Sequence, residues 1–205
     1  MAITAVVFDV GGVLEIVDDV AWPQQWLDGW SARLGLTRAE VDARLDAAGI
    51  DSVGTDAGTE RAYRRVYQVA LDLSDDQLEV MFADMWDRYC GRLDSELMGY
   101  VETLFPTYRL AIISNSGDGA RREEEKRYGF SRVFDPIMYS HEEGVAKPDP
   151  AIWSVACERI GDGPASMVFV DDSEVNVESA RAFGMAVIHH THTPTTIAAL
   201  AQLLR

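Results

Sequence analysis

Reactive polar residues follow the apolar runs of this sequence at widely separated positions. Asp9 comes directly after the run AVVF, and Asp171 and Asp172 follow MVFV. Ser114 ends the run LAIIS, and Lys147 stands in the segment GVAKPDP. Carboxylates can attack electrophiles or bind hard cations, whereas a hydroxyl and an ammonium group can hold an anion. If the fold brings them together, these residues suit chemistry on an anionic group beside a divalent metal ion.

The apolar runs are typical of strands that are buried on both faces of a parallel sheet. We expect strands over residues 3–8, 108–114, 135–140, 166–172 and 185–190. Helical patterns lie between the later runs, and each ends at a glycine. They cover residues 118–128, 150–160 and 174–183. This alternation predicts an α/β fold with a doubly wound parallel sheet.

The long segment between the first two expected strands shows helical patterns throughout. One example is Thr37 with Glu40, which matches the capping box that begins a helix. We therefore predict an α/β core of residues 1–14 and 95–205, with an inserted helical cap of residues 15–94. The tryptophans of this cap are spaced for helix packing, which explains them more simply than a ligand-binding aromatic cluster.

Ligands of open α/β sheets bind beyond the carboxyl ends of the strands, so we expect the polar residues there to converge. The carboxylates of Asp9, Asp171 and Asp172 would repel one another by roughly 4 kcal/mol per pair at about 4 Å and an effective dielectric near 20. Lys147 supplies one compensating charge, and a divalent cation with oxygen ligands, for which Mg²⁺ is the expected ion, would supply the rest. Helix capping explains any one of these acids alone, but not all of them together with Ser114 and Lys147.

The composition excludes several classes of partner. The 205 residues include 18 Lys and Arg against 34 Asp and Glu, a net charge of -16. Such a charge repels nucleic acids and anionic membrane surfaces, so we expect neither as a partner. The two cysteines show no zinc-binding spacing. The first residues lack the pattern of a leader, and no apolar run reaches the roughly 18 residues that a membrane span needs. We therefore expect no signal peptide, no membrane span and a cytoplasmic protein.

Four stretches of the chain, taken in order, resemble the motifs of the haloacid dehalogenase-like hydrolase superfamily. They are VVFDVGGVL, LAIISNS, GVAKPDP and VFVDDSEVNVESARAFGM. The resemblance covers residues 3–14 and about 108–190, and it implies a Rossmann-like core. The helical insertion resembles the cap that the phosphatase branch of this superfamily carries after its first strand.

The resemblance implies a role for each motif residue. Asp9 would attack a phosphoryl group to form an aspartyl-phosphate, and Ser114 and Lys147 would hold the phosphoryl oxygens. Asn115 would also contribute to substrate binding. The implied enzyme is a phosphomonoesterase of small phosphorylated metabolites, with sugar phosphates as the closest match.

The resemblance also implies a Mg²⁺ site. Its ligands would be the carboxylate of Asp9, the backbone carbonyl of Gly11 and the carboxylate of Asp172. Asp171 would lie nearby or act through water, and Asn176 would support the acidic loop.

Gly11 departs from the family pattern, because typical phosphatases carry a second aspartate at this position. That acid protonates the leaving group and later activates water, and such catalysis contributes roughly 10²- to 10⁴-fold. Gly11 and Gly12 would instead allow a tight turn and close approach of the backbone to a ligand. A catalytically weak phosphate-binding or regulatory domain is therefore an alternative to a phosphatase.

Two other activities of the superfamily can be weighed against the sequence. The 2-haloacid dehalogenases share the motif order but use no metal ion, and the paired acids Asp171 and Asp172 argue against this third possibility. Residues 1–125 contain no lysine, which excludes the Schiff-base mechanism of the phosphonate-cleaving members.

Charged residues of the cap and two histidines are weaker candidates. The histidines that end the last expected strand, His189 and His190, lack a metal-binding spacing, and we expect them to be structural or exposed to solvent. Four charged residues of the cap are candidates for substrate selection, namely Asp51, Asp56, Arg61 and Arg64. Ordinary surface charge is the simpler explanation for them.

Overall fold

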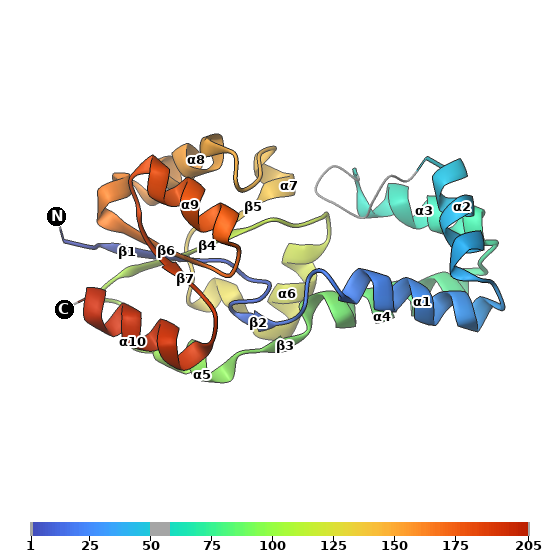
Figure 1. The fold of residues 1–205 in the computed structure, drawn as a ribbon, viewed down its shortest axis with the longest axis horizontal. Helices are drawn as coiled ribbons and strands as arrows, with labels where there is room; N and C mark the ends of the chain where they lie inside the picture. Colours follow the sequence, from blue (N-terminus) through green and yellow to red (C-terminus); the bar gives the residue numbers. More distant parts are fainter. Residues whose placement is uncertain (1, 50–57, 205) are drawn as a thin grey trace.

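The structure is a computed structural model that describes residues 2–49 and 58–204 (Figure 1). Its five-stranded sheet is parallel throughout, with the strand order β5-β4-β1-β6-β7. The strands are β1 (Ala5–Phe8), β4 (Arg109–Ser114), β5 (Ile137–Tyr139), β6 (Met167–Asp171) and β7 (Ala186–His189). Each strand lies within one of the apolar runs that predict it, so the prediction of a parallel α/β sheet is confirmed.

The helices of the α/β unit include three that the sequence pattern does not single out, α5, α7 and α10. The set is α5 (Ser95–Leu104), α6 (Ala120–Tyr128), α7 (Ser140–Glu143), α8 (Pro150–Ile160), α9 (Glu174–Phe183) and α10 (Thr193–Leu203). Two short 3-10 turns, η1 (Phe130–Arg132) and η2 (Pro164–Ser166), complete the unit.

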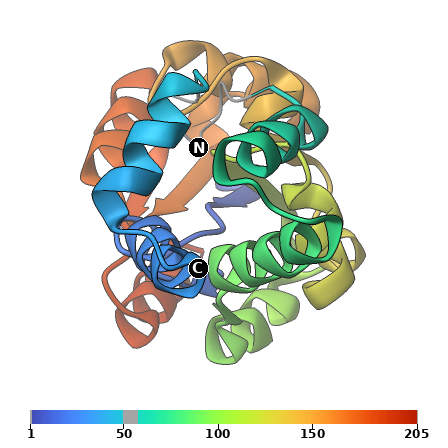
Figure 2. The same ribbon diagram turned by 90° about the vertical axis from the view of Figure 1, so that its right-hand side faces the viewer.

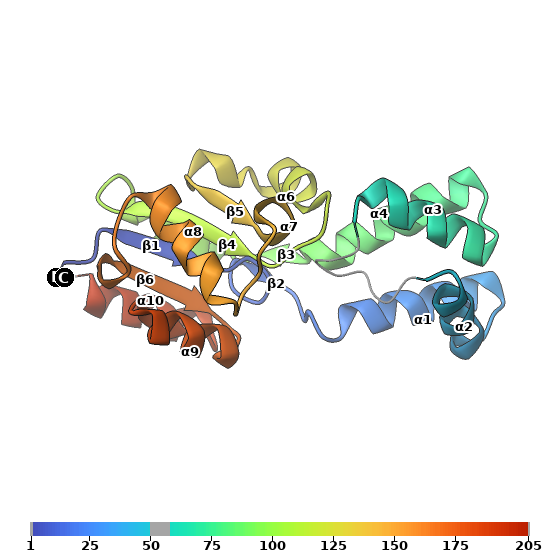
Figure 3. The same cartoon turned by 90° about the horizontal axis from the view of Figure 1, so that it is seen from above.

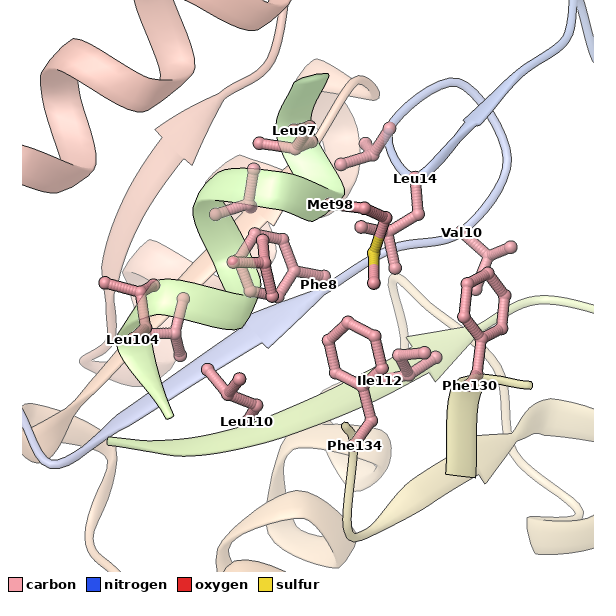
Figure 4. Packing of buried hydrophobic residues seen from close by; sticks show 14 of the residues in the cluster. Phe8, Val10, Leu14, Leu97, Met98, Leu104, Leu110, Ile112, Phe130 and Phe134 are labelled. Carbon is pink, nitrogen blue, oxygen red and sulfur yellow. The ribbon is translucent and has the colours of Figure 1, made fainter. Parts of the chain in front are cut away.

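Helices cover both faces of the sheet, because alternate residues of a strand point to opposite faces. On one face Phe8 packs with Leu97 of α5 and with Phe134, and Figure 4 shows these side chains around β1. On the other face Val7 packs with Trp153 of α8 and with residues of α9. The sheet is therefore doubly wound, as its buried, continuously apolar strands predict.

Four helices form a second unit beyond the carboxyl edge of the sheet, as Figures 1 and 3 show. They are α1 (Trp22–Leu34), α2 (Arg38–Ala47), α3 (Glu60–Leu71) and α4 (Asp75–Cys90). Trp26 and Trp30 are buried in the core of this unit with Tyr67 and Phe82, which agrees with helix packing. The capping box predicted at the start of α2 is present.

A two-stranded ribbon joins the two units. The chain leaves the α/β unit through β2 (Glu15–Ile16) and returns through β3 (Arg92–Leu93), and the two strands pair antiparallel. The backbone N–H of Asp94 donates to the carbonyl of Leu14 at 2.8 Å. In Figure 2, α1 to α4 face the viewer in front of the sheet. The ribbon supports our proposal that the cap boundaries lie near residues 15 and 94.

Across residues 2–49 and 58–204, none of the helices combines the length and apolar character that crossing a membrane would require.

Candidate active site

Three carboxylates meet at the carboxyl edge of the sheet. Asp9 follows β1 and Asp171 ends β6, and these two strands are hydrogen-bonded neighbours. One oxygen from each of Asp9, Asp171 and Asp172 lies within 4.8 Å of the others. Asp9 and Asp171, which are 162 positions apart in the sequence, therefore belong to one cluster, because parallel strands present their carboxyl ends at the same edge of the sheet.

Lys147 joins two of these carboxylates. Its Nζ lies 2.7 Å from Oδ1 of Asp9 and 2.8 Å from Oδ2 of Asp171, and its side chain is 1% exposed. Burial opposes the positive charge of Lys147, but the two carboxylates outweigh burial and raise the pKa of the ammonium group. Lys147 is therefore a fixed cation at the base of the cluster.

Asp9 combines burial with two hydrogen bonds. Its Oδ1 accepts from the backbone N–H of Val10 at 2.7 Å as well as from Lys147. Burial raises the pKa of Asp9 well above its ordinary value, and Lys147 opposes that rise. The ammonium group of Lys147 thus favours the ionised, nucleophilic form of the carboxylate.

Asp171 is held on all sides by donors. Its Oδ1 accepts from the backbone N–H of Ser173 at 2.8 Å, and its Oδ2 accepts from Lys147. The amide of Asn176 donates to both oxygens at 3.2 Å. Asp171 therefore anchors Lys147 and the acidic loop, and Asp172 is the freer of the two acids for binding a cation.

The two glycines after Asp9 leave room for two acids. A Cβ on Gly12, whose φ is +72°, would meet Oδ2 of Asp172 at 2.3 Å. A Cβ on Gly11 would meet Oδ2 of Asp19 at 2.3 Å. Side chains at these positions would displace both carboxylates, so Gly11 and Gly12 permit the close approach of Asp19 and Asp172 to the backbone beside Asp9.

Asp19 is a site residue that the sequence pattern does not reveal, because it lies ten positions from Asp9 in an otherwise featureless stretch. The residue is exposed, yet partial loss of hydration at its carboxyl group and repulsion by Asp172 raise the pKa of Asp19. Its position beside Gly11 is decided by the path of the chain into α1.

Ser114 and Asn115 approach the cluster from the end of β4. Ser114 is 3% exposed and lines the cavity above Asp9. The side chain of Asn115 donates to the carbonyl of Lys147 at 2.7 Å and accepts from its N–H at 2.9 Å. Asn115 therefore positions Lys147, and its expected role in substrate binding stays a prediction.

A cavity of about 420 Å³ opens above these groups. Its floor holds the residues that the motifs predict, namely Asp9, Gly11, Ser114, Asn115, Lys147, Asp172 and Asn176. The remaining lining residues include several from the ribbon and cap that carry no motif, namely Glu15, Asp19, Val20, Trp22, Pro23 and Tyr89. The cap unit thus supplies the wall that would contact the organic part of a substrate.

The weaker candidates lie elsewhere. Arg61 and Arg64 of α3 line a different cavity, where Arg64 pairs with Glu79. Asp51 and Asp56 lie outside the described residues. The imidazole of His189 contacts the carbonyl of Asp172 at 2.8 Å, so it supports the acidic loop. His190 is buried and its Nδ1 lies 2.9 Å from Oγ1 of Thr196, in keeping with a structural role.

The donor set fits a hard divalent cation. Asp9, Asp171 and Asp172 bring together the carboxylate oxygens that Mg²⁺ prefers. We propose the backbone carbonyl of Gly11, a residue that lines the same cavity, as a further ligand. One ammonium group among three carboxylates also leaves an excess of negative charge that a cation would neutralise.

The family of the chain follows from this fold, this site and a direct comparison. A family model described as haloacid dehalogenase-like hydrolase matches residues 3–184. The parallel sheet places Asp9, Ser114 and Asp171 at the carboxyl ends of its strands. The chain belongs to the haloacid dehalogenase-like hydrolases.

Individual relatives include both phosphatases and dehalogenases. The chain is 25% identical over 211 residues to a glyceraldehyde 3-phosphate phosphatase from Methanopyrus kandleri, a match to 91% of this chain and 83% of that protein. It is 31% identical over 81 residues to (S)-2-haloacid dehalogenase 4A from Burkholderia cepacia, a match to 40% of this chain. That match spans only 35% of the length of the dehalogenase.

A solved structure supports the fold. A HAD family enzyme from Bacteroides thetaiotaomicron, in a magnesium complex, superposes with a TM-score of 0.73 at 20% identity. The match covers 93% of this chain and 94% of that chain. At this identity the likeness concerns the architecture of core and cap.

Proposed function

We propose that this hydrolase is a Mg²⁺-dependent phosphomonoesterase of small phosphorylated metabolites, with sugar phosphates as the first candidates. The observation that carries the proposal is the contact of Lys147 with both Asp9 and Asp171, beside Asp172. This arrangement combines an acid that can act as nucleophile with a cation that can hold phosphoryl oxygens. A cytoplasmic setting remains part of the proposal.

The first step uses the carboxylate of Asp9 as nucleophile. Its oxygen attacks phosphorus, the P–O bond to the organic group breaks, and the departing alkoxide takes up a proton from solvent water. Ser114 and Lys147 orient the phosphoryl oxygens, and the buried ammonium group of Lys147 offsets the negative charge that develops on them. Asn115 keeps Lys147 in place through its backbone.

Hydrolysis of the aspartyl-phosphate completes the reaction. Water attacks phosphorus, the bond to Asp9 breaks, inorganic phosphate leaves, and a proton passes to solvent. When bound by Asp9, Asp172 and the carbonyl of Gly11, Mg²⁺ would supply positive charge to the transferring phosphoryl group.

The proposal is tested by phosphate release from a panel of sugar phosphates, nucleotides and an aryl phosphate, with Mg²⁺ and with chelator. We expect turnover that requires the cation and falls at least about 10³-fold in Asp9→Asn, because the variant lacks the nucleophile. Release that is unchanged in Asp9→Asn would contradict the proposal.

The second candidate is a phosphate-binding or regulatory domain, which the absence of a side chain at Gly11 favours. Tight binding of inorganic phosphate without turnover of any ester would support it. The third, a metal-free 2-haloacid dehalogenase, draws support from the dehalogenase relative. Halide release from 2-haloacids in the presence of chelator would establish it.

A further inference from the structure

We infer that the cavity accepts phosphate esters whose organic group is neutral or cationic and excludes those that carry a second anionic group, and that Asp19 is the specificity-determining residue. The inference rests on the proposed phosphatase function and names the substrate class of that site.

The charges that line the cavity are the first argument. Among its described lining residues, Lys147 is the one basic side chain, and its Nζ already contacts Asp9 and Asp171. The acidic lining residues are Asp9, Glu15, Asp19 and Asp172. A phosphoryl group can use Lys147 and a metal ion, but a second anionic group in the cavity would find no further cation to pair with.

The position of Asp19 is the second argument. Its Oδ2 occupies the space where the side chain of residue 11 would begin, two residues after the proposed nucleophile Asp9. Asp19 precedes α1, whose first residues Trp22 and Pro23 form part of the cap wall. The carboxylate therefore lies where the cavity floor at Gly11 meets the cap wall at the start of α1.

Exposure separates Asp19 from the other acid at this end of the cavity. Glu15 is 1% exposed, so its carboxyl group is withheld from a ligand. Asp19 is exposed at the same cavity. Asp19 is therefore the carboxylate that a bound organic group would meet, and like charges placed together disfavour binding.

The rest of the wall indicates what the organic group can be. Val20, Trp22, Pro23 and Tyr89 present apolar and aromatic surface, and the rings of Trp22 and Tyr89 lie edge to face with centroids 5.9 Å apart. Such a wall packs against the carbon skeleton of a polyol, an amine or an apolar group. An amino group would gain from the carboxylate of Asp19.

A matched series of esters tests the inference, because its members differ chiefly in charge. They are 2-hydroxyethyl phosphate, 2-aminoethyl phosphate and carboxymethyl phosphate. We expect the wild-type kcat/KM for the carboxymethyl ester to be at least about tenfold below that for the hydroxyethyl ester. In Asp19→Asn, the ratio of kcat/KM for the hydroxyethyl ester to that for the carboxymethyl ester should shrink severalfold, through a change in KM. The control Asp46→Asn removes an exposed charge from α2 and should leave this ratio unchanged. Comparing ratios between substrates cancels any general loss of activity in Asp19→Asn.

Binding provides a readout that is independent of turnover. The same esters are titrated by calorimetry into Asp9→Asn and into Asp9→Asn/Asp19→Asn, with Mg²⁺ present. The inference is supported if Asp9→Asn binds the carboxymethyl ester more weakly than the hydroxyethyl ester and if the double variant recovers that binding. This result would support the inference even if the wild-type protein hydrolyses none of the esters and the proposed function fails. Three results would overturn the inference. Asp9→Asn could bind the carboxymethyl ester as tightly as the hydroxyethyl ester or more tightly, Asp19→Asn could leave the kcat/KM ratio of these two esters unchanged, or none of the esters could bind.

Discussion

The side chain of Asn115 binds the backbone of Lys147 at both of its polar atoms, donating to the carbonyl at 2.7 Å and accepting from the N–H at 2.9 Å. These two hydrogen bonds join the end of β4 to the loop that carries the ammonium group. They explain how a residue on a loop, far from β1 in the sequence, is held against Asp9.

Replacing Asn115 should therefore displace Lys147 without removing any charge. We expect Asn115→Ala to lower kcat/KM by roughly 10- to 100-fold, because small misplacements of a catalytic group are costly. The free energy of unfolding should fall by about 1–3 kcal/mol, since two buried backbone groups lose their partners. Steady-state kinetics and urea unfolding measure the two effects, and an Asn115→Ala variant with wild-type kinetics would show that the loop holds Lys147 unaided.

Removing the ammonium group of Lys147 should be more severe. Lys147→Met leaves Asp9 and Asp171 buried without their cation, and we expect a loss of about 3–5 kcal/mol in the free energy of unfolding. The only other lysine, Lys126, is exposed on α6, so Lys126→Met serves as the control and should be nearly neutral. Adding Asp171→Asn to Lys147→Met should recover part of the loss in denaturant unfolding. Strictly additive losses would contradict the pairing.

Restoring an acid at position 11 should fail unless Asp19 is also changed. A side chain on Gly11 would meet Oδ2 of Asp19, so we expect Gly11→Asp alone to lower activity. In a background of Asp19→Ala, the same Gly11→Asp change should raise kcat by roughly 10²-fold or more on esters with poor leaving groups. The kcat values of the wild-type protein, Gly11→Asp, Asp19→Ala and the double variant separate the steric effect of the new side chain from its catalytic effect. A Gly11→Asp single variant that is faster than the wild-type protein would refute the steric argument.

Magnesium should stabilise the folded protein through Asp172. A cation that binds only the folded state at 100 times its Kd raises the free energy of unfolding by about 2.7 kcal/mol. We expect the melting temperature to rise with Mg²⁺ concentration in wild-type protein and in Asp46→Asn, and to respond far less in Asp172→Asn. An undiminished response of Asp172→Asn would place the cation elsewhere.

Two buried glutamates, Glu15 of β2 and Glu124 of α6, should make stability depend on pH. Burial and then repulsion by Glu124 raise the pKa of Glu15 from 4.5 to about 10. Burial also raises the pKa of Glu124 from 4.5 to about 7, against a hydrogen bond from Tyr139. Within the described part of the chain, Oε1 of each glutamate lacks a hydrogen-bond partner. Neutral carboxyl groups therefore suit these positions better than carboxylates.

Because both groups bind protons more tightly in the folded state, the free energy of unfolding should fall as the pH rises. The favourable contribution is complete below pH 4.5 and is lost up to about pH 7 for Glu124 and about pH 10 for Glu15. We expect Glu15→Gln, which mimics the neutral form, to gain on the order of 2 kcal/mol at pH 8 and to flatten the profile. Urea unfolding between pH 5 and 9 tests this, with the exposed Glu158→Gln as control. A Glu15→Gln variant that loses stability at pH 8 would contradict the assignment.

Much of the fold could be predicted because its signals are local. The strand runs, the helices α8 and α9 and the capping box of α2 each depend on neighbours within a few residues. The ribbon of β2 and β3 escaped prediction because its strands are two residues long and show no periodicity. The sequence pattern does not single out α5 and α10, although both pack against the sheet.

The amino-acid sequence by itself determined which reactive groups the protein has: an acid after β1, a hydroxyl at the end of β4, a lysine, and paired acids at the end of β6. Their order and their apolar flanks predict a family and an edge of the sheet, since those features are written in consecutive residues. Only the tertiary structure decided that Asn115 holds Lys147, that Asp19 takes the space beside Gly11, and that Trp22 and Tyr89 wall the cavity. The contact of Asn115 depends on how two loops of the α/β unit pack together, and the positions of Asp19, Trp22 and Tyr89 depend on where the cap unit lies over the sheet. Packing between segments distant in the chain sets both.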